Sequence, residues 1–347
     1  ISTTVWNEDE KTAMRLGLQK WTEIVGMDIE EVIATSQGDE NNADLKFYVT
    51  TDSNFEALGA QFGPHSSPYH GIGVYLRSTG DLWSTSLQPG GFGFFVILHE
   101  LGHGLGLAHP HDIGGGSYGA SSNGRFPGVI IIEKQKDEFI EKGNNDLNQC
   151  VFTVMSYVTT EADLTPSSYE PYGFLKGPMG FDIATMGHLY GLSDTFNNGN
   201  DVYIITEGEV GGVDGYTCIY DSGGTDLIQY NGNNIVTFDL RAGTLQNETG
   251  GGGFISKVDQ SNIYSGFSIA NGVTIENATG GTNDDTIYQV DSVSNVIDGR
   301  TGIDTVIYQN NFEGYSLQNE SGDGTYITVS NGSAKDILYN IEKLQFQ

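Results

Sequence analysis

The run HELGHGLGLAHP, from His99 to Pro110, restricts what this chain can fold into more than any other feature of the sequence. His99 and His103 stand four residues apart, so on a helix they project from one face, one turn above the other. His109 stands ten residues from His99, and an unbroken helix would place it about 15 Å further along the axis. For the three imidazoles to meet, the helix must end before His109. Gly106 can end it, because glycine adopts the left-handed conformation.

Three converging histidines with an open fourth position are typical of a catalytic zinc site. Glu100 adjoins the first histidine, so its carboxylate can reach a zinc-activated water and serve as general base. It would accept the proton of that water and pass it to the leaving amine, while zinc lowers the pKa of the water towards about 7. The competing interpretation, a helix face without metal, fits less well once the offsets of Gly106, His109 and Pro110 are added.

The charge balance excludes several kinds of partner. Of the 347 residues, 45 are acidic and 15 basic, which gives a formal net charge of −30 at pH 7. Nucleic acid and anionic lipid would be repelled. The longest apolar stretch, Phe92 to Leu98, is about a third of the roughly 20 residues that a membrane helix needs, so no membrane insertion is expected. The acidic excess serves either a soluble surface or oxygen ligands for cations.

Two cysteines, Cys150 and Cys218, allow at most one disulfide bridge, and the sequence leaves open whether it forms. Residue 1 is isoleucine, and no basic-then-apolar segment opens the chain. Any targeting or pro-segment is therefore expected to have been removed or left out.

We expect two domains, because a chain of 347 residues that is 37% hydrophobic can bury a sizeable core. The first is predicted to mix helices and strands. Apolar residues recur at helical spacing from Glu8 to Val25 and from Phe181 to Tyr190, and Gly191 follows as a stop. The runs Leu45 to Val49 and Gly71 to Leu76 are typical of strands.

The segment after Pro110 is predicted to be a long surface insertion. It contains a glycine- and serine-rich stretch from Gly114 to Gly124 and an apolar run from Val129 to Ile132. A charged stretch, EKQKDEFIEK, follows and could form a short helix.

From about Ser193 onward the sequence predicts an all-β domain, with short β-branched and aromatic runs between clusters of Gly, Asn and Asp. Three turns repeat loosely: DSGGTD from Asp221, GGTNDD from Gly280 and GRTGID from Gly299. An apolar pair follows each turn. A repeated turn followed by a short strand suggests a coiled β-solenoid.

The extended histidine motif resembles that of the metzincin zinc peptidases, HExxHxxGxxH. Pro110, after the third histidine, resembles the serralysin type, and VMSY, from Val154 to Tyr157, is similar to that family's Met-turn. The resemblance covers nearly the whole chain, through Trp21, Asp182 to Gly191 and Gly272 to Gly281. It implies a secreted zinc endopeptidase: an α/β metzincin catalytic domain followed by an all-β, calcium-binding parallel β-roll or sandwich.

The resemblance also assigns roles to single residues. It makes His99, His103 and His109 the ligands of one zinc ion. Tyr157 would be an extra zinc ligand that swings away to stabilise the oxyanion, which suits a phenol held near the metal. Met155 would form a hydrophobic floor beneath the ligands, although a methionine there could also be an ordinary core residue.

Several structural calcium ions are implied for the second domain, held by aspartate side chains and turn carbonyls of successive coils. The residues that match a calcium turn and the strand facing it are Asn197, Gly199, Asp201, Asp221, Gly223, Gly224 and Asp226. Further matches are the pair Thr274 and Glu276 and the repeat aspartates Asp285 and Asp304, whose separation of 19 exceeds two nonapeptides by one. Each cluster could also be an ordinary β-turn, which favours the same residues.

The sequence departs from the serralysin pattern in several places. The segment from His109 to Met155 is longer, and it lies where that fold forms one wall of the primed-side pocket, which leaves substrate preference open. The two cysteines, the short segment before the first helix and the small number of repeats are also unusual. The chain ends at Ile341 to Gln347, text that usually continues in related calcium-repeat proteins, so we expect a truncated or processed form.

We therefore expect a monomeric, secreted endopeptidase that cleaves internal bonds of protein or peptide substrates, with a catalytic domain at 1–192 and a calcium-binding domain at 193–347. Residues expected to pair with substrate backbone, as an edge strand, are Gly71, Ile72, Gly73 and Val74. An ordinary core strand is the alternative. Histidines expected to be loop or packing residues are His65, His70, His111 and His188.

Two other functions remain open. One is a calcium-dependent surface-binding or adhesion protein with an inactive zinc domain, against which the intact Glu100 and Tyr157 argue. The other is a processing protease of narrow specificity, for which the long insertion is the only support.

Overall fold

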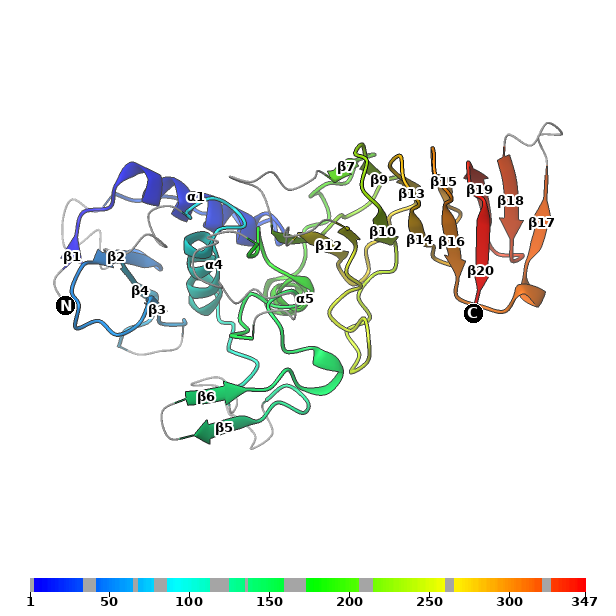
Figure 1. The fold of residues 1–347 in the computed structure, drawn as a ribbon. Helices are drawn as coiled ribbons and strands as arrows, with labels where there is room; N and C mark the ends of the chain where they lie inside the picture. Colours follow the sequence, from blue (N-terminus) through cyan, green and yellow to red (C-terminus); the bar gives the residue numbers. More distant parts are fainter. Residues whose placement is uncertain are drawn as a thin grey trace.

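The computed structural model describes residues 3–33, 42–64, 68–77, 86–112, 125–134, 137–158, 173–205, 215–259, 265–319 and 326–347. The chain runs from a part that mixes helices with a small sheet to an elongated stack of strands (Figure 1). Within these ranges no helix combines the length and the apolar character needed to cross a membrane.

The helices of the first part lie close to where the sequence predicts them. Their bounds are α1, Glu8–Thr22; α4, Phe92–Gly104; and α5, Gly180–Tyr190. Helix α1 packs on α4, where the fully buried Trp21 donates a hydrogen bond from Nε1 to the carbonyl of Leu98 at 3.1 Å. Gly17 permits this approach, because a Cβ atom there would lie 2.8 Å from the side chain of Ile97. The packing fixes the helix that carries the histidine motif.

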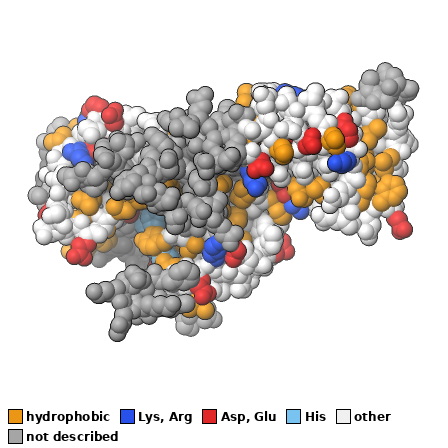
Figure 2. Space-filling model, in the orientation of Figure 1, with side chains coloured by type: hydrophobic (Ala, Val, Ile, Leu, Met, Phe, Trp, Pro, Cys, Tyr) orange, Lys and Arg blue, Asp and Glu red, His pale blue; other side chains and the backbone are white. Residues whose placement is uncertain are grey.

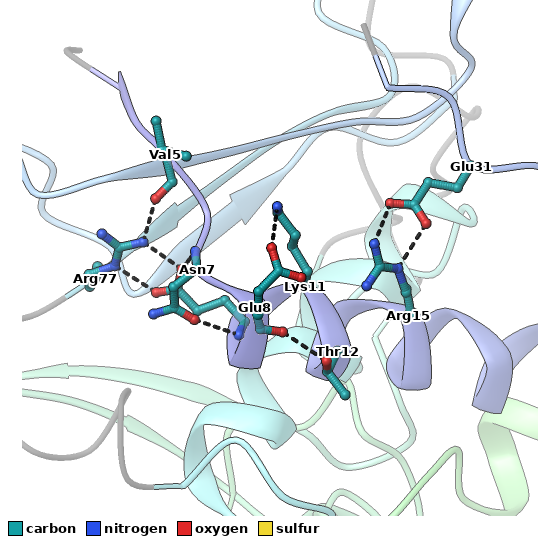
Figure 3. A network of polar contacts seen from close by, with 9 residues as sticks. Val5, Asn7, Glu8, Lys11, Thr12, Arg15, Glu31 and Arg77 are labelled. Carbon is teal, nitrogen blue, oxygen red and sulfur yellow. Dashed lines mark hydrogen bonds and ion pairs between the residues drawn. The ribbon is translucent and has the colours of Figure 1, made fainter.

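A network of polar contacts ties the start of α1 to the sheet (Figure 3). Asn7 and Glu10 form a capping box, in which each side chain accepts the backbone N–H of the other residue at 2.8–2.9 Å. Arg77 donates to the buried carboxylate of Glu10 at 2.6 Å and to the carbonyl of Val5 at 2.8 Å. The helix therefore begins at a defined point beside the sheet.

The first sheet has the strand order β1-β2-β4-β3. Its strands are β1, Thr3–Thr4; β2, Lys46–Thr50; β3, Gly59–Gln61; and β4, Ile72–Leu76. Strand β4 is parallel to β2 and antiparallel to β3.

The prediction that Gly71 to Leu76 forms an edge strand is wrong, because β4 pairs with a neighbour on each side. Gly71, Ile72, Gly73 and Val74 therefore do not present a free backbone edge. The alternating pattern of this segment shows only that one face is buried, and it carries no information on which strands flank it. Among the described strands, the two outer ones of this sheet are β1 and β3.

The short helix expected in EKQKDEFIEK is also wrong. Strands β5, Ile131–Lys134, and β6, Asp137–Ile140, pair antiparallel there, with Ile131 opposite Ile140. The charged residues favour a helix only weakly, and a partner strand overrides that preference. A 3-10 turn, η1, Asn144–Asp146, follows the hairpin.

The second part is built of strands, apart from one 3-10 turn, η2, Phe312–Gly314, among the residues described. The strands are β7, Val202–Ile205; β8, Tyr216–Ile219; β9, Leu227–Tyr230; β10, Val236–Asp239; β11, Lys257–Val258; β12, Gly266–Ile269; β13, Asn277–Thr279; β14, Thr286–Tyr288; β15, Val296–Asp298; β16, Thr305–Tyr308; β17, Ser316–Gln318; β18, Tyr326–Ser330; β19, Lys335–Tyr339; and β20, Lys343–Phe346. They form one sheet in the order β17-β18-β19-β15-β13-β9-β7 and another in the order β11-β10-β14-β16-β20, while β12 pairs with β8.

Most neighbouring strands of this stack are parallel and belong to successive coils of the chain. Asn277 pairs with Val296, and Thr286 pairs with Thr305, so the chain advances 19 residues (296 − 277 and 305 − 286) in this coil. As the repeating turns predict, β9, β14 and β16 begin directly after Asp226, Asp285 and Asp304. Fully buried side chains fill the space between the two sheets: Ile228, Phe238, Ala278, Ile287, Ile297, Val306 and Leu338.

The question of a disulfide bridge has a clear answer, because Cys150 and Cys218 are both free and buried. Burial raises the pKa of each thiol to about 12. Both side chains therefore act as small core residues rather than as reactive groups.

Candidate metal centre

The imidazoles of His99, His103 and His109 converge as their spacing predicts. The Nε2 atom of His109 lies 3.1 Å from Nε2 of His99 and 3.0 Å from Nε2 of His103. Helix α4 ends at Gly104, and Gly106 has φ of +101°, which turns the chain back towards the helix face. On the face of the molecule drawn in Figure 2, histidine surface, in pale blue, lies within a recess.

Each of these rings has its other nitrogen held by an acceptor. Nδ1 of His99 lies 2.8 Å from the carbonyl of Val154, and Nδ1 of His103 lies 2.9 Å from the carbonyl of Leu107. Nδ1 of His109 lies 3.0 Å from Oδ2 of Asp112. Carbonyl and carboxylate oxygens only accept, so the proton of each neutral ring is on Nδ1.

Three Nε2 atoms therefore converge, each on a ring whose Nδ1 already faces an oxygen acceptor. Burial lowers the pKa of His99 to about 3 and that of His103 to about 4, so neither ring takes up a proton near neutral pH. Such a set of converging acceptors fits a cation, and three imidazoles with a second shell of oxygen acceptors suit zinc. The side chains of His99, His103 and His109 are therefore suited to the zinc ion that their spacing predicts.

The segment from Val154 to Tyr157, which resembles a Met-turn, packs against the helix that carries the histidine motif. Met155 is 1% exposed, and a Cβ atom at Gly102 of α4 would lie 2.5 Å from its sulfur. The buried carboxylate of Asp182, in the first turn of α5, accepts hydrogen bonds from Thr153 at 2.6 Å and from the backbone of Val154 at 2.7 Å. The carbonyl that holds His99 is therefore itself fixed from α5.

Comparison with known proteins gives relatives that include several metalloproteases named serralysin. The chain is 28% identical to Serralysin of Proteus mirabilis over 306 residues, which cover 83% of this chain and 55% of that protein. It is 25% identical to Serralysin C of Dickeya chrysanthemi over 291 residues (81% and 53%) and 27% identical to Metalloprotease AprA of Pseudomonas entomophila over 284 residues (80% and 52%). The chain is a relative of the serralysin-type metalloproteases.

The resemblance to serralysin-type metalloproteases that was found in the sequence is therefore confirmed. No family model matches the chain. The chain spans about half the length of the curated relatives it matches.

His99, His103 and His109 form what we call the histidine tripod. Glu100, which follows His99 on α4, directs its side chain towards β3. Its side chain is 7% exposed, and burial raises its pKa to about 7. The backbone N–H of Gln61 donates to the carboxylate and lowers that pKa in part. A Cβ atom at Gly59 would lie 2.6 Å from Cγ of Glu100, so the strand can approach this closely only as glycine. A carboxylate poised near neutrality suits a general base.

Tyr157 lies over the tripod, and 57% of its surface is exposed. Its ring centroid is 5.4 Å from that of His99 and 4.6 Å from that of His109. Burial raises the pKa of the phenol above its usual value. A protonated hydroxyl in this place can donate a hydrogen bond above the histidines.

The other histidines occupy different surroundings. His65 lies outside the described residues, and His70 and His188 are exposed, as expected of surface residues. His111 is a packing residue, one of the two alternatives expected for it, and its place is beside the metal centre. It is 7% exposed and stacks on His109 at the tripod.

The predicted calcium turn and its facing strand come together. Carboxylate oxygens of Asp201, Asp221 and Asp226 lie within 4.8 Å of one another. Asp226 is 1% exposed, and its Oδ2 atom has no hydrogen-bond partner in the part of the chain that the structure describes. Gly224 has φ of +146°, and a Cβ atom there would lie 1.7 Å from the carbonyl of Gly199. This oxygen-rich cluster could hold a hard cation.

The remaining calcium candidates have other described contacts. Asn197 donates a hydrogen bond to Tyr203, and the backbone N–H of Gly223 donates to Asp221. Thr274 is exposed, whereas Glu276 accepts the N–H of Asp226 at 2.8 Å. These contacts neither support nor contradict calcium binding, so the role of each of these residues as a calcium ligand stays a prediction.

Asp285 and Asp304 lie on successive coils, and their carboxylates accept hydrogen bonds from backbone N–H groups. Asp285 accepts the N–H groups of Val236 at 2.9 Å and Gly281 at 2.6 Å. Asp304 accepts the N–H of Asp285 at 2.7 Å through Oδ1, while its buried Oδ2 has no hydrogen-bond partner within the described ranges. Both oxygens of Asp285 are thus engaged, so Asp304 keeps more capacity for a cation.

Sequence reasoning missed the groups that orient the histidines. Asp112 stands three residues after His109, a spacing that a tight turn brings within reach, so it could have been found. The carbonyls of Leu107 and Val154 carry no signal in the sequence, because every residue has one. Asp182 lies in a stretch that resembles serralysins, but its contact with the Met-turn required the structure.

Proposed function

We propose that the chain is a secreted, zinc-dependent endopeptidase that hydrolyses internal peptide bonds of protein substrates. The observation that carries this proposal is the convergence of three imidazole Nε2 atoms beside a buried carboxylate. The relatedness to serralysins supports the same chemistry. We further propose that residues 1–192 carry the catalysis and that 193–347 form a domain stabilised by several calcium ions.

The residues of the site divide the work of the reaction. When bound by His99, His103 and His109, zinc would supply a Lewis acid that lowers the pKa of a water molecule and polarises the scissile carbonyl. Glu100 accepts the proton of the attacking water and returns it to the leaving amine. The hydroxyl of Tyr157 donates a hydrogen bond to the oxygen that becomes negative.

The outer edge of β3 is where an extended substrate would pair. Phe62 directly follows β3. Its N–H donates to the carbonyl of Ile72 at 2.9 Å, and its carbonyl accepts the N–H of Gly71 at 3.0 Å, so both groups face the side of β4. Backbone groups alternate in direction along an antiparallel strand, so those of Gly59 and Gln61 point away from β4, and the N–H of Gln61 already donates to Glu100. Substrate backbone added there would lie beside Glu100.

Casein is a suitable first substrate, because it is extended and offers many bonds. The protein loaded with zinc and calcium is expected to cleave it at internal bonds, which mass spectrometry of the products would show. A zinc-selective chelator should stop cleavage, added zinc should restore it, and far-UV circular dichroism should change little. An unchanged rate after verified removal of zinc would refute the metal dependence. No cleavage with zinc verified in place would favour a processing protease of narrow specificity or a binding protein.

The carboxylate of Asp112 is expected to strengthen zinc binding. It fixes the ring of His109 through Nδ1, and removal of such a partner typically weakens metal affinity about 10- to 100-fold. The Asp112→Asn variant should show a loss of that size in competition with a chromophoric chelator. Asp28→Asn removes the same charge from an exposed aspartate and serves as control. Equal affinities of the two variants would contradict this role.

A further inference from the structure

We propose that His111 is a positioning residue, whose ring holds Tyr157 over the histidine tripod. The inference rests on the proposed function, in which the hydroxyl of Tyr157 acts on the reacting carbonyl. It concerns a histidine outside the motif HExxHxxGxxH.

The ring of His111 fills the space between two groups of the site. It stacks on His109 with centroids 4.7 Å apart and planes 15° from parallel. Its centroid also lies 4.8 Å from that of Tyr157, with the planes inclined by 51°. His111 thus contacts both a tripod imidazole and the phenol above it.

The backbone that carries His111 is itself fixed. Nε of Arg125 donates to the carbonyl of His111 at 2.8 Å, and the N–H of Phe126 donates to the carbonyl of Pro110 at 2.9 Å. Asp112 accepts the backbone N–H of His109 at 3.1 Å, which closes the turn on the other side. Because the ring is also 93% buried, His111 has little freedom to move.

Tyr157 depends on contact with His111 because much of its side chain is exposed and few other groups hold it in place. Ser156, just before it, is fully buried, and its hydroxyl donates to Asn148 at 2.9 Å. Beyond that anchor, 57% of the tyrosine is exposed, and its described ring contacts are with His99, His109 and His111. Loss of one of these rings would let the phenol adopt other rotamers and lower the fraction of time it spends above the tripod.

Packing, rather than metal binding, is the role assigned to His111. Its Nδ1 atom is buried and has no hydrogen-bond partner among the described residues, which costs stability and which phenylalanine at this position would avoid. Phenylalanine keeps a flat ring but cannot ligate a metal. The variants His111→Phe and His111→Ala therefore separate the ring from the nitrogen, and His188→Ala, an exposed histidine on α5, is the matched control.

The test uses the full chain with copper(II) in place of zinc, because a tyrosine ligand gives copper(II) a visible charge-transfer band. His111→Ala should lose most of this band, and its zinc form should show kcat lowered about 10- to 100-fold with KM little changed. His111→Phe should keep the band and most of the kcat. Zinc content should be equal in all variants.

Other outcomes would overturn the inference. A band and a kcat unchanged in His111→Ala would show that the ring is dispensable, and a His111→Phe variant as impaired as His111→Ala would assign the effect to the nitrogen. Absence of the band from the unsubstituted protein would remove Tyr157 from the metal and this inference with it. That result would leave the endopeptidase proposal standing, since casein cleavage tests it separately.

Discussion

The Glu100→Gln variant is expected to lose about 10³-fold in kcat/KM for casein, within the range that general acid–base catalysis contributes. Glutamine has nearly the shape of glutamate and can still accept the N–H of Gln61 through its amide oxygen. It cannot take a proton from water near neutral pH. The three histidines stay in place, so bound zinc, measured by elemental analysis, should be unchanged.

The matched control is Glu8→Gln, which makes the same change on an exposed turn of α1. It should cleave casein at the parent rate. Retention of most activity by Glu100→Gln, with zinc bound, would remove Glu100 from the role of base. Loss of zinc from that variant would instead show that the buried carboxylate supports the metal site.

The spacing of His99, His103 and His109 made the metal centre predictable, because few backbone conformations bring these three rings together. A helix, a break and a return are needed to bring rings four and ten residues apart to one point. The helix end at Gly104 and the positive φ of Gly106 confirm this. The helices α1 and α5 were predictable for a similar reason, since each has one apolar face of helical period.

The sequence does not show which strands pair with one another in the sheets. Strand β4 shows that one of its faces is buried, yet whether it lies at an edge depends on β3, a segment of three residues with no clear alternation. The hairpin of β5 and β6 depends likewise on pairing between Ile131 and Ile140. Pairing is a tertiary property, and local propensity describes it poorly.

In the second part, the repeated turns predicted the starts of strands but not the use of each carboxylate. Asp226, Asp285 and Asp304 all precede a strand, and all are buried. Only the structure separates Asp285, whose two oxygens accept backbone N–H groups, from Asp226 and Asp304, which each keep one oxygen without a hydrogen bond. Identical residues at equivalent turns therefore differ in their capacity to bind a cation.

Removal of calcium is expected to destabilise the strand stack. A site with free calcium at 100 times its Kd stabilises the folded state by about 2.7 kcal/mol. This corresponds to a rise of roughly 5–11 °C in melting temperature for a unit of this size. Excess chelator should lower the thermal transition followed by circular dichroism by at least that amount, and Asp226→Asn should lose most of the difference. Asp259→Asn, at an exposed aspartate, should keep it.

The calcium effect should be larger at pH 8 than at pH 5. Burial raises the pKa of Asp226 above its usual value and that of Asp304 to about 6. A carboxyl group whose pKa is raised by folding stabilises the folded state in acid, and that stabilisation is lost as the pH rises through the folded-state pKa. Without calcium the stack should therefore be weakest above about pH 6, where the carboxylates are charged and repel one another. A calcium shift that is the same at both pH values would mean that these buried carboxylates are not the ligands.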